Sequence, residues 1–133
     1  MPITASKSTG GTTYASPFVG NIDHFVSVRI DISALTSREV DAAGHLKPGA
    51  TFNLATGLLP TAAGQKVGVT HEPIKLGATL ALVQANTNDP FVALGVIGVL
   101  NRDIMEDNLG SAVSANEIAA LDGAGSRLVL GLT

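Results

Sequence analysis

The clearest alternation of apolar and polar residues lies in residues 22–32. Side chains two positions apart share one face of an extended chain, so this period places one set against a core and the other in solvent. The apolar set is Val26, Val28, Ile30 and Ile32, and the polar set is Ser27, Arg29 and Asp31. The pattern predicts a half-buried β-strand.

A continuous apolar run covers residues 91–100, directly after the turn-forming sequence Asn-Thr-Asn-Asp-Pro. Gly95 and Gly98 interrupt the run, and a glycine inside a strand often marks the close approach of another part of the chain. The run has about half of the roughly 20 residues that a membrane-spanning helix needs. We therefore expect a buried central strand and no membrane span.

Weaker patterns complete the expected fold. Short strands are predicted over residues 51–54, 67–71, 79–85 and 127–132. Ser114 and Glu117 have the spacing of a capping box, which predicts a short helix that ends near Leu121. Together with 15 Gly and 6 Pro, these patterns predict a mainly β fold with one or two short helices, in a compact β-sandwich or barrel-like domain.

Residues 1–21 are rich in Ser, Thr, Gly and Ala and show no sustained period. They predict a flexible N-terminal arm, followed by a single β-rich domain over residues 22–133. The arm contains one cluster of larger side chains, namely Tyr14, Pro17, Phe18 and Val19. Two interpretations stay open: a binding arm that docks on a partner through this cluster by strand addition, or a disordered terminus. The start of the chain does not have the layout of a signal peptide.

The amino-acid composition indicates which partners the protein can have and excludes cysteine chemistry. Charged residues make up 14% of the chain against a typical value of about 25%, which indicates that part of the apolar surface meets another subunit. The net charge is −3 and the basic residues are scattered, so neither DNA nor RNA is an expected direct ligand. Because the chain has no Cys, it has no disulfides, no thiolate catalysis and no zinc–thiolate site, and it is suited to a reducing cytoplasm.

Motifs of known catalytic and cofactor sites are missing. His24, His45 and His71 lack the spacing of metal ligands, and the His-Glu pair at residues 71–72 runs into Pro73. No G-x-S-x-G elbow, G-x-G-x-x-G loop or Walker motif occurs. We therefore expect no catalytic residue, no metal and no cofactor.

Residues 101–108 concentrate three carboxylates and two amides after the apolar run. Such a cluster can bind a hard cation or supply paired acids. The interpretation we favour is a solvated loop or the polar rim of an oligomer contact, with Asn101, Arg102 and Asp103 as the contact residues.

The order of several features carries a resemblance: the polar arm, the sequence GHLKPG at residues 44–49, GVIGVL at 95–100 running into NRD at 101–103, and the small late helix. In this order the chain resembles the capsid decoration proteins of tailed bacteriophages, the lambda-type head-stabilising or cement proteins. The resemblance implies a homo-oligomer, a trimer, on the outer surface of the virion capsid after synthesis in the host cytoplasm. It also implies that the arm orders against the lattice of the major capsid protein, that the head is braced against internal DNA pressure, and that the protein is not an enzyme.

Two other classes of function remain as alternatives. One is a carbohydrate- or receptor-binding β-module of a phage particle, which the absence of Trp and the single Tyr disfavour because sugars stack on aromatic rings. The other is a small hydrolytic or metal-dependent enzyme, which only the acidic cluster at residues 101–108 supports.

Overall fold

The computed structural model describes residues 14–76, 80–85, 89–123 and 126–131. The described elements, in chain order, are β1 (Phe18–Arg29), a short 3-10 helix η1 (Ile32–Ala34), β2 (His45–Leu46), β3 (Thr51–Asn53), β4 (Val67–Val69), β5 (Ile74–Lys75), α1 (Leu80–Ala85), β6 (Phe91–Asn101), α2 (Arg102–Leu109), α3 (Ala115–Leu121) and β7 (Arg127–Gly131). Strands dominate, so the mainly β fold with short helices is confirmed.

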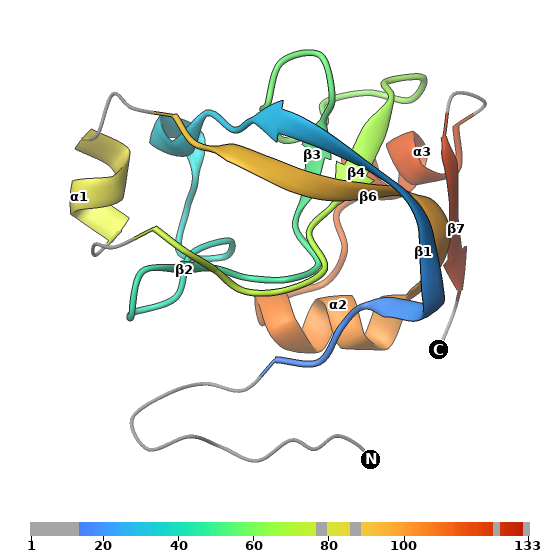
Figure 1. The fold of residues 1–133 in the computed structure, drawn as a ribbon, viewed down its shortest axis with the longest axis horizontal. Helices are drawn as coiled ribbons and strands as arrows, with labels where there is room; N and C mark the ends of the chain where they lie inside the picture. Colours follow the sequence, from blue (N-terminus) through green and yellow to red (C-terminus); the bar gives the residue numbers. More distant parts are fainter. Residues whose placement is uncertain (1–13, 77–79, 86–88, 124–125, 132–133) are drawn as a thin grey trace.

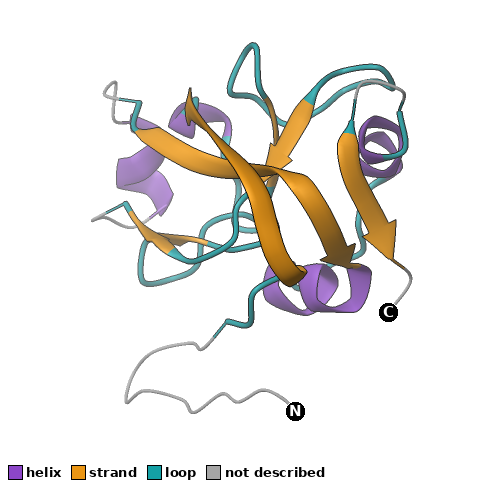
Figure 2. Cartoon of the chain, turned by 45° about the vertical axis from the view of Figure 1, so that its right-hand side comes forward, coloured by secondary structure: helices purple, strands orange, loops and turns teal. Residues whose placement is uncertain are grey.

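Strand β6 organises the main sheet (Figure 1). One of its edges pairs with β1, and the other pairs with β4 at Gly95 and then with β7 from Ile97 to Asn101. The sheet has the order β1-β6-β4-β3 with β7 parallel to β6, while β2 and β5 form a separate pair. Figure 2 shows α2 at the end of the sheet, close to where β1 begins and β6 stops.

The pairing of β1 with β6 changes register twice. Val19 pairs with Val99 and the next pair is His24 with Ile97, so β1 advances five residues while β6 advances two. The following pair, Phe25 with Gly95, leaves Val96 as an extra residue on β6. Such bulges bend a strand and redirect its side chains. The bulge at Val96 lies midway along β6.

Among the described residues, two apolar clusters form the core, one around Phe52 and the other around Phe18 and Met105. The ring of Phe18 lies across the two glycines of β6. A Cβ atom added at Gly95 would lie 2.5 Å from Cζ of Phe18, and one at Gly98 would lie 3.0 Å from its Cδ1. The expected close approach at these glycines is therefore confirmed, and it explains why the apolar run is interrupted.

Most of the predicted strands are confirmed. The first begins at Phe18 and ends at Arg29, and β3, β4 and β7 lie within their predicted ranges. The capping box is also confirmed, because Ser114 Oγ accepts from the Glu117 N–H and the Glu117 carboxylate accepts from the Ser114 N–H. Strand β6 is less buried than expected, since Phe91 and Val99 are 66% and 43% exposed.

Two segments differ from the prediction. Residues 80–85 of the expected strand 79–85 form helix α1, which buries Val83 against the core that includes Ile32. The expected acidic loop after β6 is helix α2. Asn101 caps its start by accepting from the Ile104 N–H, and Gly110 ends it with a φ of 73°. Asp103 in the first turn further favours the helix, because the N-terminal end carries partial positive charge.

Candidate protein-interaction surface

The residues predicted to anchor a free arm are mostly part of the folded domain. The Tyr14 hydroxyl donates to Asp41 Oδ2 at 2.7 Å. Pro17 is buried, its carbonyl accepts from the Asn101 N–H at 2.7 Å, and Phe18 is 7% exposed. Val19 alone of the four faces solvent, at 54% exposure. The folded part therefore begins by residue 14 and not at residue 22, and residues 1–13 of the predicted arm lie outside the described residues.

The Tyr14–Asp41 contact is strengthened by charge. Burial alone would raise the pKa of Asp41, but the Tyr14 hydroxyl and the N–H groups of His45 and Ala43 hold the pKa below its ordinary value. Asp41 is therefore ionised at neutral pH, and a charged acceptor makes a stronger hydrogen bond than a neutral one. This bond ties the start of the described chain to the loop before β2.

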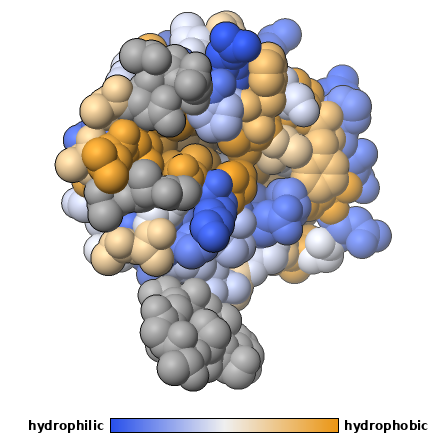
Figure 3. Space-filling view, turned by 60° about the vertical axis from the view of Figure 1, so that its left-hand side comes forward, coloured by the Kyte–Doolittle hydropathy of each residue, from blue (hydrophilic) through white to orange (hydrophobic). Residues whose placement is uncertain are grey.

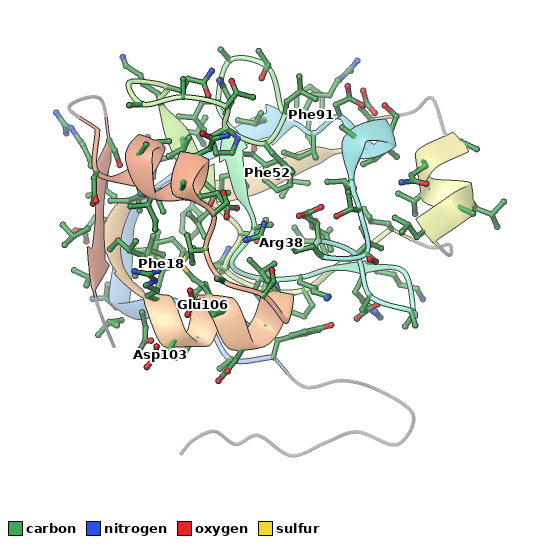
Figure 4. All side chains as sticks on the ribbon, turned by 180° about the vertical axis from the view of Figure 1, so that it is seen from behind. Phe18, Arg38, Phe52, Phe91, Asp103 and Glu106 are labelled. Atoms are coloured by element: carbon green, nitrogen blue, oxygen red, sulfur yellow. The ribbon has the colours of Figure 1, made fainter. Side chains whose placement is uncertain are left out.

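The three predicted rim residues have different roles. Asn101 caps α2, and Arg102 forms an ion pair with Glu106 at 3.2 Å. The Val113 N–H and the Arg102 side chain together lower the pKa of Glu106. Asp103 is exposed on the first turn of α2 (Figure 4) and is the member of the three that remains open to a partner.

The densest polar cluster of the described residues is structural. Arg38 donates to both carboxylate oxygens of Glu117, at 2.6 and 3.1 Å, and to Glu39 Oε2 at 3.3 Å. Both carboxylates are almost fully buried, and Glu39 Oε1 accepts from the Thr36 N–H and hydroxyl. Although burial opposes it, these hydrogen bonds and charges raise the pKa of Arg38. The cluster joins the loop after η1 to α3, and its acceptors are already used.

An exposed apolar row crosses the sheet. Val19 of β1 pairs with Val99 of β6, and Val99 pairs with Val129 of β7. These side chains are 54%, 43% and 59% exposed, and we call them the valine row. Isolated exposed valines are ordinary, whereas these three are brought side by side across three strands by the pairing of the sheet and form one apolar stripe. Sequence reasoning named Val19 but could not bring the three together, because the row depends on strand register.

A second exposed apolar region lies at the other end of the molecule. Leu82 on α1 is 63% exposed, and Figure 3 shows apolar residues reaching the surface on the side that carries α1. Phe91 is 66% exposed, but the Arg29 guanidinium lies 4.9 Å from its ring centroid and partly covers it. This region is less regular than the valine row, which therefore remains the better candidate contact surface.

Three further observations bear on the class of protein. Within the described residues, no three His, Asp or Glu side chains are grouped to hold a metal ion. None of the described helices has the length and apolar character needed to cross a bilayer. Comparisons of the chain with protein families, with curated proteins and with solved structures found no match.

Proposed function

We propose that this chain is a structural protein that binds the outer surface of a viral capsid as an oligomer, a trimer, and stabilises the head against the pressure of packaged DNA. The observation that carries the proposal is the valine row, an exposed apolar stripe on an otherwise well-packed β-domain. The resemblance of the GHLKPG and GVIGVL segments to decoration proteins supplies the identity of the partner, the major capsid protein lattice.

The energetics suit a lattice-binding oligomer better than a one-to-one complex. Full burial of a Val side chain is worth at least about 1.5 kcal/mol, so three half-exposed valines contribute roughly 2–3 kcal/mol for each subunit. This is weak for a single contact. When three subunits bind together, the second and third contacts benefit from a high effective concentration, which raises the total affinity by about 10²–10⁴-fold.

Co-sedimentation with expanded, DNA-free heads of tailed bacteriophages tests the proposal, with the mass in solution measured in parallel. We expect a stable oligomer that sediments with heads of at least one type and raises their resistance to heat. A chain that stays in the supernatant with every head type would contradict the proposal.

The valine row is tested with Val129→Asp, which places a charge at the β7 end of the row, next to Val99. Val129 is exposed on β7, so we expect the variant to fold normally and to lose co-sedimentation. Ala63→Asp, at an exposed loop position, is the matched control and should sediment like the parent chain. Undiminished head binding by Val129→Asp would exclude the valine row as the contact.

Deletion of residues 1–13 tests the arm separately. This change retains Tyr14 and its bond to Asp41, so the domain should keep its stability. Loss of head binding with an unchanged melting temperature would assign the arm a binding role, and full binding would exclude one.

A further inference from the structure

A small pocket opens between β1, β4, β6 and β7, with a volume of about 240 Å³. Its polar lining is entirely basic and consists of His24, Lys66 and Arg127. The remaining walls are apolar and come from Leu54, Val67, Val96 and Ile97. None of the described residues that line the pocket is acidic.

The fold brings the basic side chains together through strand register. His24 pairs with Ile97, and Ile97 pairs with Arg127, so the two basic residues flank Ile97 in one row across β1, β6 and β7. Lys66 directly precedes β4, which pairs with β6 at Gly95. The pocket lies where β6 carries its extra residue, Val96, and therefore at the bulge of the sheet.

These charges have no acidic partners among the described residues. The ion pairs of the described chain involve Arg38, His45, His71 and Arg102, and none of them includes a pocket residue. The whole chain is acidic, with a net charge of −3. Lys66 and Arg127, two cations without ion-pair partners among the described residues in one hollow of an acidic protein, favour an anionic ligand, and the His24 imidazole beside them can donate a hydrogen bond to it.

The size of the pocket limits what enters it. Sites for cofactors and drug-sized molecules have volumes of about 300–1,000 Å³, so this pocket accepts one side chain or one chain end. The valine row adjoins it, because Val99 and Val129 stand two residues beyond Ile97 and Arg127 on the same strands. Residues two apart on an extended chain are about 6.8 Å apart and share a face. An extended peptide with a carboxylate two positions from an apolar side chain matches both features.

We propose that this pocket binds the carboxylate of an acidic, extended segment of a partner protein, whose neighbouring apolar side chain packs on the valine row. The assignment of that partner as the capsid protein rests on the proposed function. The first 13 residues of a second copy do not match, because they contain Lys7 and no acidic residue. A nucleic acid strand also fits poorly, since its phosphates need basic residues spaced along a groove and not gathered in one hollow.

Binding of synthetic peptides to the full chain tests the proposal. The probes are fluorescein-labelled Gly-Ser-Glu-Thr-Val-Ser-Gly and a set with varied residues around the Glu-x-Val core, and each has a counterpart with Gln in place of Glu. Fluorescence anisotropy should show at least tenfold tighter binding of the Glu peptides. Amide NMR shifts on binding should centre on His24, Val96 and Ile97.

Variants locate the binding site. Arg127→Gln and Lys66→Gln change exposed side chains, so the domain should remain folded, and each should weaken the Glu peptides about tenfold. Lys75→Gln removes an exposed charge outside the pocket and is the matched control, with no expected change. Equal losses in all three variants would show general charge attraction and overturn the proposal.

Other results would also overturn it. Millimolar or absent binding of every Glu peptide, or equal binding of the Gln peptides, would do so. So would acetate alone producing the same amide NMR shifts, or displacement of the peptide by a ten-residue thymidine oligonucleotide. The two proposals fail separately. Peptide binding without binding to any head would overturn the capsid function and leave the pocket assignment standing. Head binding without peptide binding would overturn the pocket assignment and leave the capsid function standing.

Discussion

Replacing Gly95 by Ala tests how tightly the sheet is packed against its own N-terminal residues. The added Cβ would lie 2.5 Å from Cζ of Phe18 and 3.0 Å from Cγ2 of Ile22. Favourable contacts between carbon atoms lie at about 3.5–4.0 Å, so the ring must move by about 1 Å. The same ring also meets the second glycine, Gly98, which prevents it from sliding along β6.

The size of the effect follows from two opposing contributions. Overpacking of a well-packed core costs about 1–3 kcal/mol. Exchange of Gly for Ala in a strand stabilises by roughly 0.5–1 kcal/mol, because the unfolded chain loses conformational freedom. We therefore expect Gly95→Ala to lower the free energy of unfolding by about 1–2 kcal/mol. For a chain of this length, this corresponds to a melting temperature roughly 3–8 °C lower.

Urea unfolding followed by far-UV circular dichroism measures this change, at one fixed protein concentration because oligomerisation would shift the midpoint. Ala93→Val, on an exposed position of the same strand, is the control and should stay within about 0.5 kcal/mol of the parent. Phe18→Leu removes Cζ, so combining it with Gly95→Ala should recover part of the loss, with a coupling of about 0.5–3 kcal/mol. Unchanged or increased stability of Gly95→Ala, or strictly additive effects, would refute the reasoning.

Two further predictions concern polar contacts. Arg38→Ala leaves the buried carboxylates of Glu39 and Glu117 without their cation and should lower the free energy of unfolding by about 2–4 kcal/mol. The loss is smaller than for a fully buried pair because the Arg38 side chain is 22% exposed. Arg38→Lys should recover part of the loss, and equal urea midpoints for the two variants would contradict the role of the guanidinium group. Tyr14→Phe removes a hydrogen bond that lowers the pKa of Asp41, so the parent should be more stable than the variant above pH 4. A depressed carboxyl pKa contributes stability that is lost as the pH falls through the pKa of the folded state, so the difference in unfolding free energy between parent and variant should shrink in acid. A difference that does not change with pH would exclude the ionised Asp41 carboxylate as the acceptor.

Sequence periodicity predicted the strands well where the pattern was long. Residues 22–32 and 91–100 predicted the two longest strands, β1 and β6, because one had a clear period of two and the other a continuous apolar run. The short apolar segment at residues 79–85 was misassigned as a strand, since a run of this length satisfies either period and its packing against η1 decides the outcome. The sequence did carry local signals for helix α2, namely Asn101 as its N-cap and Gly110 as its C-cap. The segment was nevertheless predicted as a loop because of its acidic composition.

The candidate surface was harder to predict for a physical reason. The valine row and the basic pocket each join residues from the beginning, the middle and the end of the chain. Their alignment depends on bulges that shift β1 against β6, and one residue of slippage would turn each side chain to the opposite face. Local patterns carry no information on that register. Phe18 was predicted to anchor an arm on a partner protein, but its side chain is 7% exposed and its ring lies against Gly95 and Gly98 of the domain's own sheet.

The antiparallel pairing of β1 with β6 also affects how the protein is made. Phe18 and Val19 pair with Leu100 and Val99, so about three quarters of the chain must leave the ribosome before the first strand meets its partner. At about 5–20 residues per second, β1 stays unpaired for several seconds during translation. Contacts between such distant residues also slow folding, because the connecting chain must first be ordered. Synthesis of this protein therefore includes an interval in which a nascent amphipathic strand is open to chaperones and to other nascent chains.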